Sequence, residues 1–201
     1  MSYDLTKFKH GLEELNITLT DEQIEQFLRY YEMLVEKNKV MNLTGITEYE
    51  EVIQKHFLDS LSLIRVIPDI ASQELTVIDL GTGAGFPGLP LKIAFPELEI
   101  TLMDSLNKRI LFLQEVINAL DLKKVSAVHG RAEEMASNAA HRQQYDLCVS
   151  RAVSNLAVLT EYCLPFVKKG GLFVSYKSAD SDTEIQEGKK QFPFLVENLL
   201  P

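Results

Sequence analysis

The spacing of apolar residues changes partway along the chain. Over residues 21–36, apolar side chains recur every three or four positions, which predicts an amphipathic helix (Ile24, Phe27, Leu28, Tyr31, Leu34 and Val35). A further helix is predicted from about residue 49 to 65. Residues 20–23 and 47–50 read T-x-x-Q and T-x-x-E, which are capping boxes at two helix starts. We therefore expect residues 1–67 to form an N-terminal helical extension.

Short apolar runs then alternate with helix-like segments. Strands are predicted at residues 75–80, 98–103, 124–128, 145–150 and 171–177. Helices are predicted at about 88–95, 106–120, 132–138, 154–164 and 182–192. This alternation predicts an α/β fold, with a doubly wound, mostly parallel sheet and helices on both faces, as one compact unit over residues 68–201. Right-handed crossovers would bring the carboxyl ends of the strands to one edge, where a ligand cleft forms.

The first predicted strand leads into a glycine-rich segment, residues 77–88 (VIDLGTGAGFPG). Glycine at alternate positions lets the backbone approach a ligand closely, because no Cβ intervenes and positive φ is accessible. The helix that follows would offer free N–H groups and a partial positive charge to an anion. This segment therefore predicts a loop for a small, partly anionic, nucleotide-like molecule.

Two templates fit the loop. Residues 83–88 match G-x-G-x-x-G, the dinucleotide fingerprint, whereas residues 79–85 match D-x-G-x-G-x-G, which is typical of S-adenosylmethionine (SAM) methyltransferases. Asp104 ends the second apolar run and can accept hydrogen bonds from both ribose hydroxyls of either cofactor. The chain leaves little room for the substrate domain of a dehydrogenase, which favours SAM. A dinucleotide site and a purely structural turn remain open alternatives.

Polar residues follow the next two predicted strands. Glu133 can accept a hydrogen bond from an adenine amino group, and its alternative role is to stabilise a helix N-terminus. Arg151 offers a planar donor fork to a carboxylate, a phosphate or the O6/N7 edge of guanine, and its alternative role is a surface salt bridge. Gly81, Asp104, Glu133 and Arg151 all fall at or just past strand ends, so they are expected to meet at one edge of the sheet.

Composition narrows the class of protein. The chain has 201 residues, of which 46% are hydrophobic, and no apolar run reaches the ~18 residues that cross a bilayer. We expect a cytoplasmic protein without a membrane segment. Cys148 and Cys163 lie in apolar segments and are expected to be buried packing residues. The four histidines lack ligand spacing, so no metal is expected. The net charge of −9 argues against nucleic-acid binding that depends on overall charge attraction to the phosphates.

Taken together, seven segments resemble one family, the bacterial small-subunit ribosomal RNA guanine-N7 methyltransferases, called RsmG or GidB. They span nearly the whole chain: residues 41–47 (MNLTGIT), 55–60 (KHFLDS), 79–88 (DLGTGAGFPG), 104–109 (DSLNKR), 130–133 (GRAE), 150–153 (SRAV) and 164–170 (LPFVKKG). The set is more specific than the glycine loop alone.

The resemblance implies a class I SAM-dependent methyltransferase fold, SAM as cofactor, S-adenosylhomocysteine as product, and a guanine of 16S rRNA in the small ribosomal subunit as substrate. The cofactor contacts that it implies, together with the glycine loop, fall on Gly81, Gly83, Gly85, Phe86, Asp104, Ala132, Glu133 and Arg151. The family ends in an antiparallel strand pair. Residues 194–199 match the first of these strands, and the last has no counterpart before Pro201.

The chemistry that the resemblance implies requires no general base, because guanine N7 carries a lone pair and no proton. Arg151 is then expected to orient the reactants, and catalysis would consist mostly of alignment. Two rival functions remain open: an assembly factor that binds cofactor and RNA without transferring a methyl group, and a small-molecule methyltransferase whose helical extension is a lid. We expect a monomer.

Overall fold

Five parallel strands form one sheet in the computed structural model, which describes residues 3–151, 155–177 and 186. The strand order is β3-β2-β1-β4-β5. Their bounds are β1 (Thr76–Leu80), β2 (Glu99–Asp104), β3 (Val125–His129), β4 (Tyr145–Arg151) and β5 (Val167–Tyr176). β1 is buried on both faces, as parallel sheets covered by helices are. The predicted α/β architecture is confirmed, and β5 begins four residues earlier than the sequence pattern predicts.

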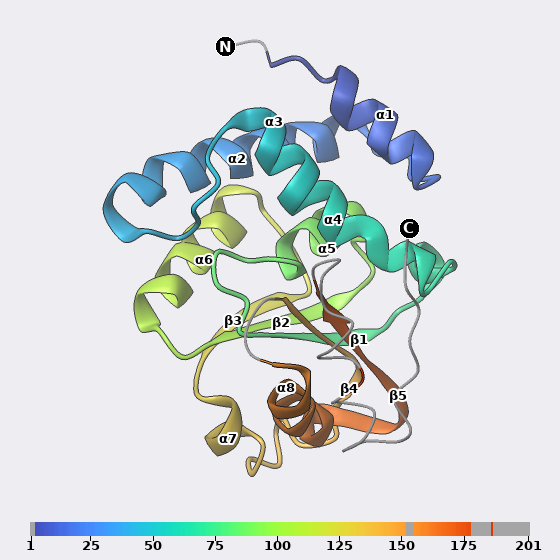
Figure 1. Cartoon of the computed structure of the whole chain (residues 1–201), viewed down its shortest axis with the longest axis vertical. Coiled ribbons are helices and arrows are strands. Elements are labelled where there is room, and N and C mark those ends of the chain that lie inside the picture. Colours follow the sequence, from blue (N-terminus) through green and yellow to red (C-terminus); the bar gives the residue numbers. More distant parts are fainter. Residues whose placement is uncertain (1–2, 152–154, 178–185, 187–201) are drawn as a thin grey trace.

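Helices cover both faces of this sheet (Figure 1). α5 (Gly88–Ala94) and α6 (Asn107–Ala119) lie on one side, and α7 (Ala132–Met135) and α8 (Leu156–Cys163) lie on the other. The register pairs Leu80 with Met103 and Asp104 with His129. The ends of β1, β2 and β3 are therefore level, so the loops that follow them open at the same edge.

The first 67 residues are mostly helical, as predicted. α1 (Thr6–Glu14) and α2 (Asp21–Met41) precede a continuous helical run, which consists of α3 (Tyr49–Val52), a π-helical segment (Ile53–Leu58), α4 (Asp59–Leu61) and a 3-10 turn (Ser62–Arg65). Further 3-10 turns span Ile70–Ser72 and Leu164–Phe166. Figure 1 shows this extension lying over the α5 and α6 side of the sheet.

One of the two predicted capping boxes is present. The Thr20 hydroxyl accepts a hydrogen bond from the Gln23 N–H at 3.2 Å, and the Gln23 side chain accepts one from the Thr20 N–H at 2.9 Å. The prediction for residues 47–50 is wrong. The helix begins at Tyr49, so Glu48 occupies the N-cap and makes no side-chain capping bond. Thr47 lies one residue too early to cap, and its carbonyl accepts a hydrogen bond from Tyr31 instead.

The helical extension and the sheet share one hydrophobic core. Phe8, Phe27 and Phe57 are fully buried in the same cluster as Val77 of β1. Tyr30 is also fully buried, although the sequence pattern places Tyr31 in the apolar stripe; Tyr31 is half-buried at the edge of this core. The domain boundary at residue 67 stays a prediction.

The structure confirms one of the remaining sequence predictions, and two others concern residues that it does not describe. Cys148 and Cys163 are buried and free, as expected. The predicted helix at 182–192, apart from residue 186, and the predicted strand at 194–199 lie outside the described residues. Within the described ranges, no helix is both long and apolar enough to pass through a membrane.

Candidate functional site

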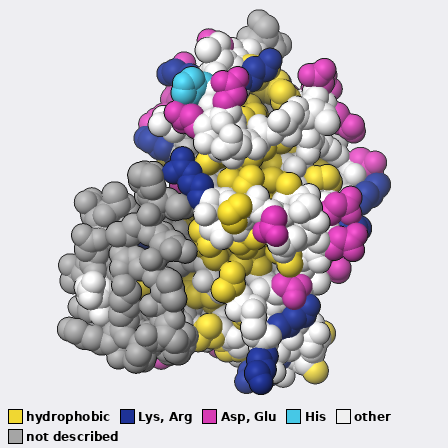
Figure 2. Space-filling view, turned by 90° about the vertical axis from the view of Figure 1, so that its right-hand side faces the viewer, with side chains coloured by type: hydrophobic (Ala, Val, Ile, Leu, Met, Phe, Trp, Pro, Cys, Tyr) yellow, Lys and Arg dark blue, Asp and Glu magenta, His cyan; other side chains and the backbone are white. Residues whose placement is uncertain are grey.

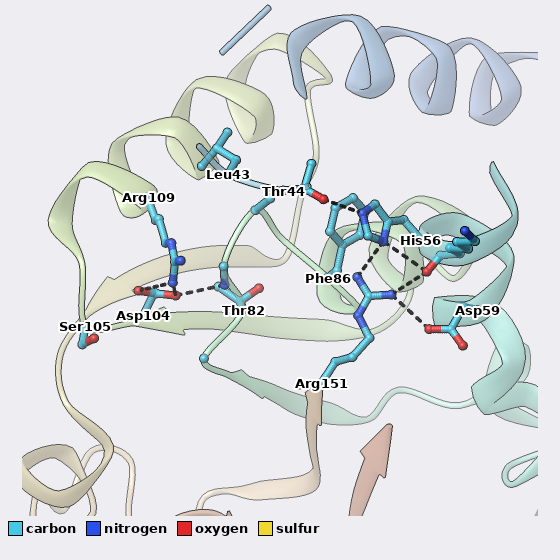
Figure 3. A pocket seen from close by; sticks show the side chains of 14 residues that line it. Leu43, Thr44, His56, Asp59, Thr82, Phe86, Asp104, Ser105, Arg109 and Arg151 are labelled. Atoms are coloured by element: carbon cyan, nitrogen blue, oxygen red, sulfur yellow. Dashed lines mark hydrogen bonds and ion pairs between the residues drawn. The ribbon is translucent and has the colours of Figure 1, made fainter. Parts of the chain in front are cut away.

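A cavity of about 510 Å³ opens at the carboxyl edge of the sheet (Figure 3). Three groups of residues line it. The sheet and its loops supply Gly81, Thr82, Gly83, Ala84, Phe86, Asp104, Ser105, Arg109 and Arg151. The segment after α2 supplies Leu43 and Thr44, and the helical run supplies Lys55, His56 and Asp59. The cavity is therefore built jointly by the sheet and the helical extension.

The glycine loop is held by the buried carboxylate of Asp79. Its Oδ2 accepts hydrogen bonds from the Thr82 hydroxyl at 2.6 Å and from the Gly88 N–H at 2.7 Å, so it joins the two ends of the loop. Burial raises the pKa of Asp79 to about 6, and the two hydrogen bonds and Arg151 oppose that rise. Its Oδ1 is buried without a hydrogen-bond partner among the described residues.

Two glycines in this loop are required for different reasons. A Cβ on Gly88 would lie 2.3 Å from the Leu102 side chain and 2.8 Å from Asp79 Oδ2, so a side chain there would break the loop anchor. Gly83 has φ +61°, and a Cβ added there would meet no atom within 4 Å. Gly83 therefore exposes its backbone to open space in the cavity, which suits close approach by a ligand.

The start of α5 does not form the expected anion site. The Gly88 N–H bonds to Asp79, and every residue of α5 is buried. The amide groups that the sequence offers to an anion are therefore used within the protein, and the cavity lining ends at Phe86.

Asp104 lies at the end of β2 with its carboxylate in the cavity wall. It accepts hydrogen bonds from the Gly83 N–H and the Leu106 N–H, both at 2.9 Å. The Arg109 guanidinium lies 3.1 Å from its Oδ2. Asp104 therefore lies beside the glycine loop as expected, and its role as ribose acceptor stays a prediction; Arg109 is a neighbour that the sequence did not predict.

Arg151 lies across the cavity from Asp104, at the end of β4 (Figure 3). Its Nη1 donates to the Lys55 carbonyl at 3.1 Å and pairs with Asp59 Oδ2 at 3.0 Å. Its guanidinium carbon lies 4.9 Å from the centre of the Phe86 ring, in cation–π geometry. Its side chain is only 15% exposed and joins two layers of the molecule. Arg151 is therefore more than the partner in a surface salt bridge, which was the alternative role that its sequence position allowed.

His56 completes this side of the cavity. Its ring stacks on Phe86 with centroids 4.5 Å apart, and its Nε2 lies 2.8 Å from the Thr44 hydroxyl. Burial, and then the nearby Arg151 charge, lower the pKa of His56 to about 4. The imidazole is therefore neutral near pH 7, and the cations of this wall are Arg151 and Lys55, which pair with Asp59 and Glu51.

Five of the eight predicted cofactor residues line the cavity: Gly81, Gly83, Phe86, Asp104 and Arg151. The other three do not. Gly85 faces Leu89 and Tyr30. Ala132 and Glu133 begin α7, outside the lining, and Glu133 raises the pKa of the Tyr162 hydroxyl beside it. The adenine contacts expected at Ala132 and Glu133 stay predictions.

The cavity residues that the sequence reasoning did not assign come mostly from the helical extension. Two sequence features could have pointed to these cavity residues. One is the polar connector after α2, and the other is the pair His56 and Asp59, three positions apart on one helix. They are joined through Arg151, which lies within hydrogen-bonding distance of both. Among the described residues, no cluster of three or more His, Cys, Asp or Glu is placed to hold a metal ion.

Comparison with known proteins agrees with this geometry. Residues 23–200 match the family model GidB, described as rRNA small subunit methyltransferase G. The chain belongs to the GidB family. Its relatives include Ribosomal RNA small subunit methyltransferase G of Lachnoclostridium phytofermentans, 58% identical over 92% of this chain and 76% of that protein. The namesake from Leuconostoc citreum is 52% identical over 94% of this chain and 79% of that protein.

Solved structures support the fold of this GidB chain. A Staphylococcus aureus protein assigned to the caffeoyl-CoA O-methyltransferases aligns over 95% of this chain and 88% of its own, with TM-score 0.54 and 15% identity. Precorrin-6y C5,15-methyltransferase from Geobacter metallireducens aligns over 68% of this chain and 74% of its own, with TM-score 0.51 and 15% identity. At this identity the likeness concerns the class I methyltransferase fold alone.

Proposed function

We propose that this chain transfers the methyl group of SAM to N7 of a guanine in 16S rRNA. The observation that carries the proposal is the joint cavity. A carboxylate, Asp104, and a guanidinium, Arg151, line the same cavity on either side of an open glycine loop, in a member of the GidB methyltransferase family. Relatives over 50% identical are named for methylation of small-subunit rRNA.

The residues present fit an adenosyl cofactor. Asp104 would accept the ribose hydroxyls, and the exposed backbone of Gly81 and Gly83 would pack against the cofactor. When bound, SAM supplies an electrophilic methyl group on a sulfonium sulfur. Phe86 lies on the Arg151 side of the cavity, where its ring contacts the Arg151 guanidinium and the His56 imidazole.

The remaining wall is suited to orient an acceptor base rather than to remove a proton. Guanine N7 needs no deprotonation before it attacks a methyl group, so a general base is unnecessary. His56 is neutral and bonded to Thr44, which agrees with an orienting role. Alignment of reacting groups supplies roughly 7–11 kcal/mol in favourable cases.

Charge bears on how the RNA is held. The net charge is −9, and Figure 2 shows Lys and Arg side chains interspersed with Asp and Glu side chains on the face in view. Such a surface favours recognition of a folded RNA or a ribonucleoprotein over non-specific attraction to any strand. The substrate would place the protein in the cytoplasm, and the monomeric state stays a prediction.

The direct test is transfer of tritium from [methyl-³H]SAM into purified 30S subunits and into protein-free 16S rRNA. The expected product is 7-methylguanosine at one position, detected by mass spectrometry of nuclease digests. SAM binding without transfer would support the assembly-factor alternative. Transfer only to a small molecule would support the lid alternative. A methyl group on another atom of the RNA would contradict the N7 assignment.

A further inference from the structure

The connector after α2 holds Thr44 firmly at the cavity wall. α2 ends at Met41, and its C-cap residue, Asn42, adopts a left-handed conformation with φ 49°. The side-chain oxygen of Asn38 then accepts hydrogen bonds from the N–H groups of Leu43 at 2.6 Å and Thr44 at 2.9 Å. The backbone of Thr44 is therefore fixed by the helix end, although it lies in a loop.

The Thr44 hydroxyl oxygen has two neighbours that can donate to it. The Ile46 N–H lies 3.1 Å away, and His56 Nε2 lies 2.8 Å away. A hydroxyl oxygen has two acceptor lone pairs and one hydrogen. If both neighbours donate, the hydroxyl hydrogen remains for a third partner, and Thr44 lines the cavity. The tautomer of His56 decides whether this is so.

Arg151 sets that tautomer. Its Nη2 lies 3.3 Å from His56 Nδ1 and can only donate. The Lys55 carbonyl also lies 3.1 Å from Nδ1 and accepts a hydrogen bond from Arg151 Nη1. A carbonyl oxygen can accept two hydrogen bonds, so this contact is compatible with either tautomer. The fixed positive charge of Arg151 beside Nδ1 favours a lone pair there, which places the ring hydrogen on Nε2. His56 then donates to Thr44, which leaves the hydroxyl of Thr44 as a donor toward the cavity.

We propose that Thr44 is a specificity-determining residue whose hydroxyl donates a hydrogen bond to O6 of the target guanine. This inference rests on the proposed function. O6 lies beside N7 on the same edge of guanine and is an acceptor, whereas adenine presents an amino donor at that position. A hydroxyl that is held as a donor can form a hydrogen bond with O6 of guanine. The same hydroxyl would meet the amino group of adenine donor to donor, so adenine is disfavoured. Arg151 and His56 act through Thr44 and are positioning residues for this contact.

A cycle of side-chain and base substitutions tests the contact. The enzyme is wild type, Thr44→Val or Thr44→Ser. The RNA carries either guanine or 2-aminopurine at the mapped target; 2-aminopurine keeps N7 and lacks O6. We expect wild type and Thr44→Ser to prefer guanine by about 5–100-fold in kcat/KM. Thr44→Val should lose most of that preference. Thr18→Val, at an exposed threonine outside the cavity lining, is the matched control and should keep the preference.

Each outcome decides the matter. If Thr44→Val prefers guanine as strongly as wild type does, the contact with O6 is absent. If Thr44→Val weakens SAM binding in calorimetry and leaves base preference unchanged, the hydroxyl serves the cofactor and the inference is wrong. If wild type transfers no methyl group to either RNA, the proposed function itself fails, which the wild-type arm alone reveals.

Discussion

Arg151 Nη1 lies 3.0 Å from Asp59 Oδ2, although the two residues are 92 positions apart in sequence. Arg151 ends β4, and Asp59 begins α4 in the helical extension. The same guanidinium nitrogen also reaches the Lys55 carbonyl. This contact joins the helical extension to the end of β4, so one side chain holds together the two layers that line the cavity.

Replacement of Arg151 should impair methyl transfer more than it impairs folding. Arg151→Lys keeps the charge but loses the planar fork that reaches Asp59, Lys55 and His56 together. We expect kcat/KM for 16S rRNA to fall about 10–150-fold, which corresponds to the loss of one or more charge-assisted hydrogen bonds. Arg142→Lys, on the exposed turn before β4, is the control. Transfer by Arg151→Lys at the wild-type rate would show that the fork has no role at the reacting groups.

Replacement of Asp104 should act mainly on the cofactor. Asp104→Asn keeps the size of the side chain and removes the charge that would strengthen bonds to the ribose hydroxyls. We expect SAM affinity to fall about 10–150-fold in calorimetry. Asp121→Asn is a suitable control because its side chain is 84% exposed in a distant turn. Equal SAM affinity in Asp104→Asn and wild type would reject the ribose assignment.

Local patterns in the sequence were sufficient for the sheet and for the residues that follow its strands. The five strands and the cavity positions of Asp104 and Arg151 follow from apolar periodicity and the rules for parallel sheets, and the Thr20 capping box follows from its T-x-x-Q motif. These are properties of short segments, or of the common edge that right-handed crossovers impose.

What the sequence could not indicate depends on contacts between distant segments. The π-helical turn that carries His56 has no propensity signal, because such turns are fixed by packing and often accompany functional sites. The Asp79–Gly88 bond, which removes the expected anion site, needs the folded loop. The choice of Tyr30 over Tyr31 for the core depends on where the glycine loop lies, since Tyr30 donates to the Ala84 carbonyl.

The contact between Tyr30 and Ala84 should link stability to cofactor binding. The Tyr30 hydroxyl donates to the Ala84 carbonyl at 2.6 Å in a fully buried position. Tyr30→Phe should lower the free energy of unfolding by about 1–3 kcal/mol, because the carbonyl is left without a donor. It should also weaken SAM binding, because Ala84 lies in the cofactor loop. Tyr31→Phe, which loses a bond to Thr47, is the matched control and should leave SAM affinity unchanged.

The lowered pKa of His56 should make stability depend on pH. Folding lowers this pKa from 6.5 to about 4, so the unfolded chain binds a proton before the folded protein does. The contribution of His56 to the free energy of unfolding is therefore fully present above pH 6.5. It falls by about 2–3 kcal/mol as pH falls toward 4. The difference in free energy of unfolding between wild type and His56→Gln, measured by urea unfolding at several pH values, should show this loss, because both proteins share the contribution of Asp79. Parallel curves for the two proteins would contradict the neutral, buried imidazole.

The raised pKa of Asp79 should make the free energy of unfolding depend on pH in the opposite direction. Its pKa is raised from 3.8 to about 6 in the folded protein, so the folded state binds the proton more tightly than the unfolded chain. Its contribution to stability falls by roughly 2–3 kcal/mol as pH rises from 3.8 through 6. Asp79→Asn should remove this slope, whatever its effect on absolute stability. A difference curve between Asp79→Asn and wild type that is flat over this range would exclude a buried carboxylate with a raised pKa.

The most direct measurement of the central claim is a crystal structure of the protein with S-adenosylhomocysteine, the demethylated product. We predict density along the joint cavity, with the ribose hydroxyls on the Asp104 carboxylate and the sulfur toward Phe86 and Arg151. Density for the compound elsewhere, or with its ribose away from Asp104, would contradict the account.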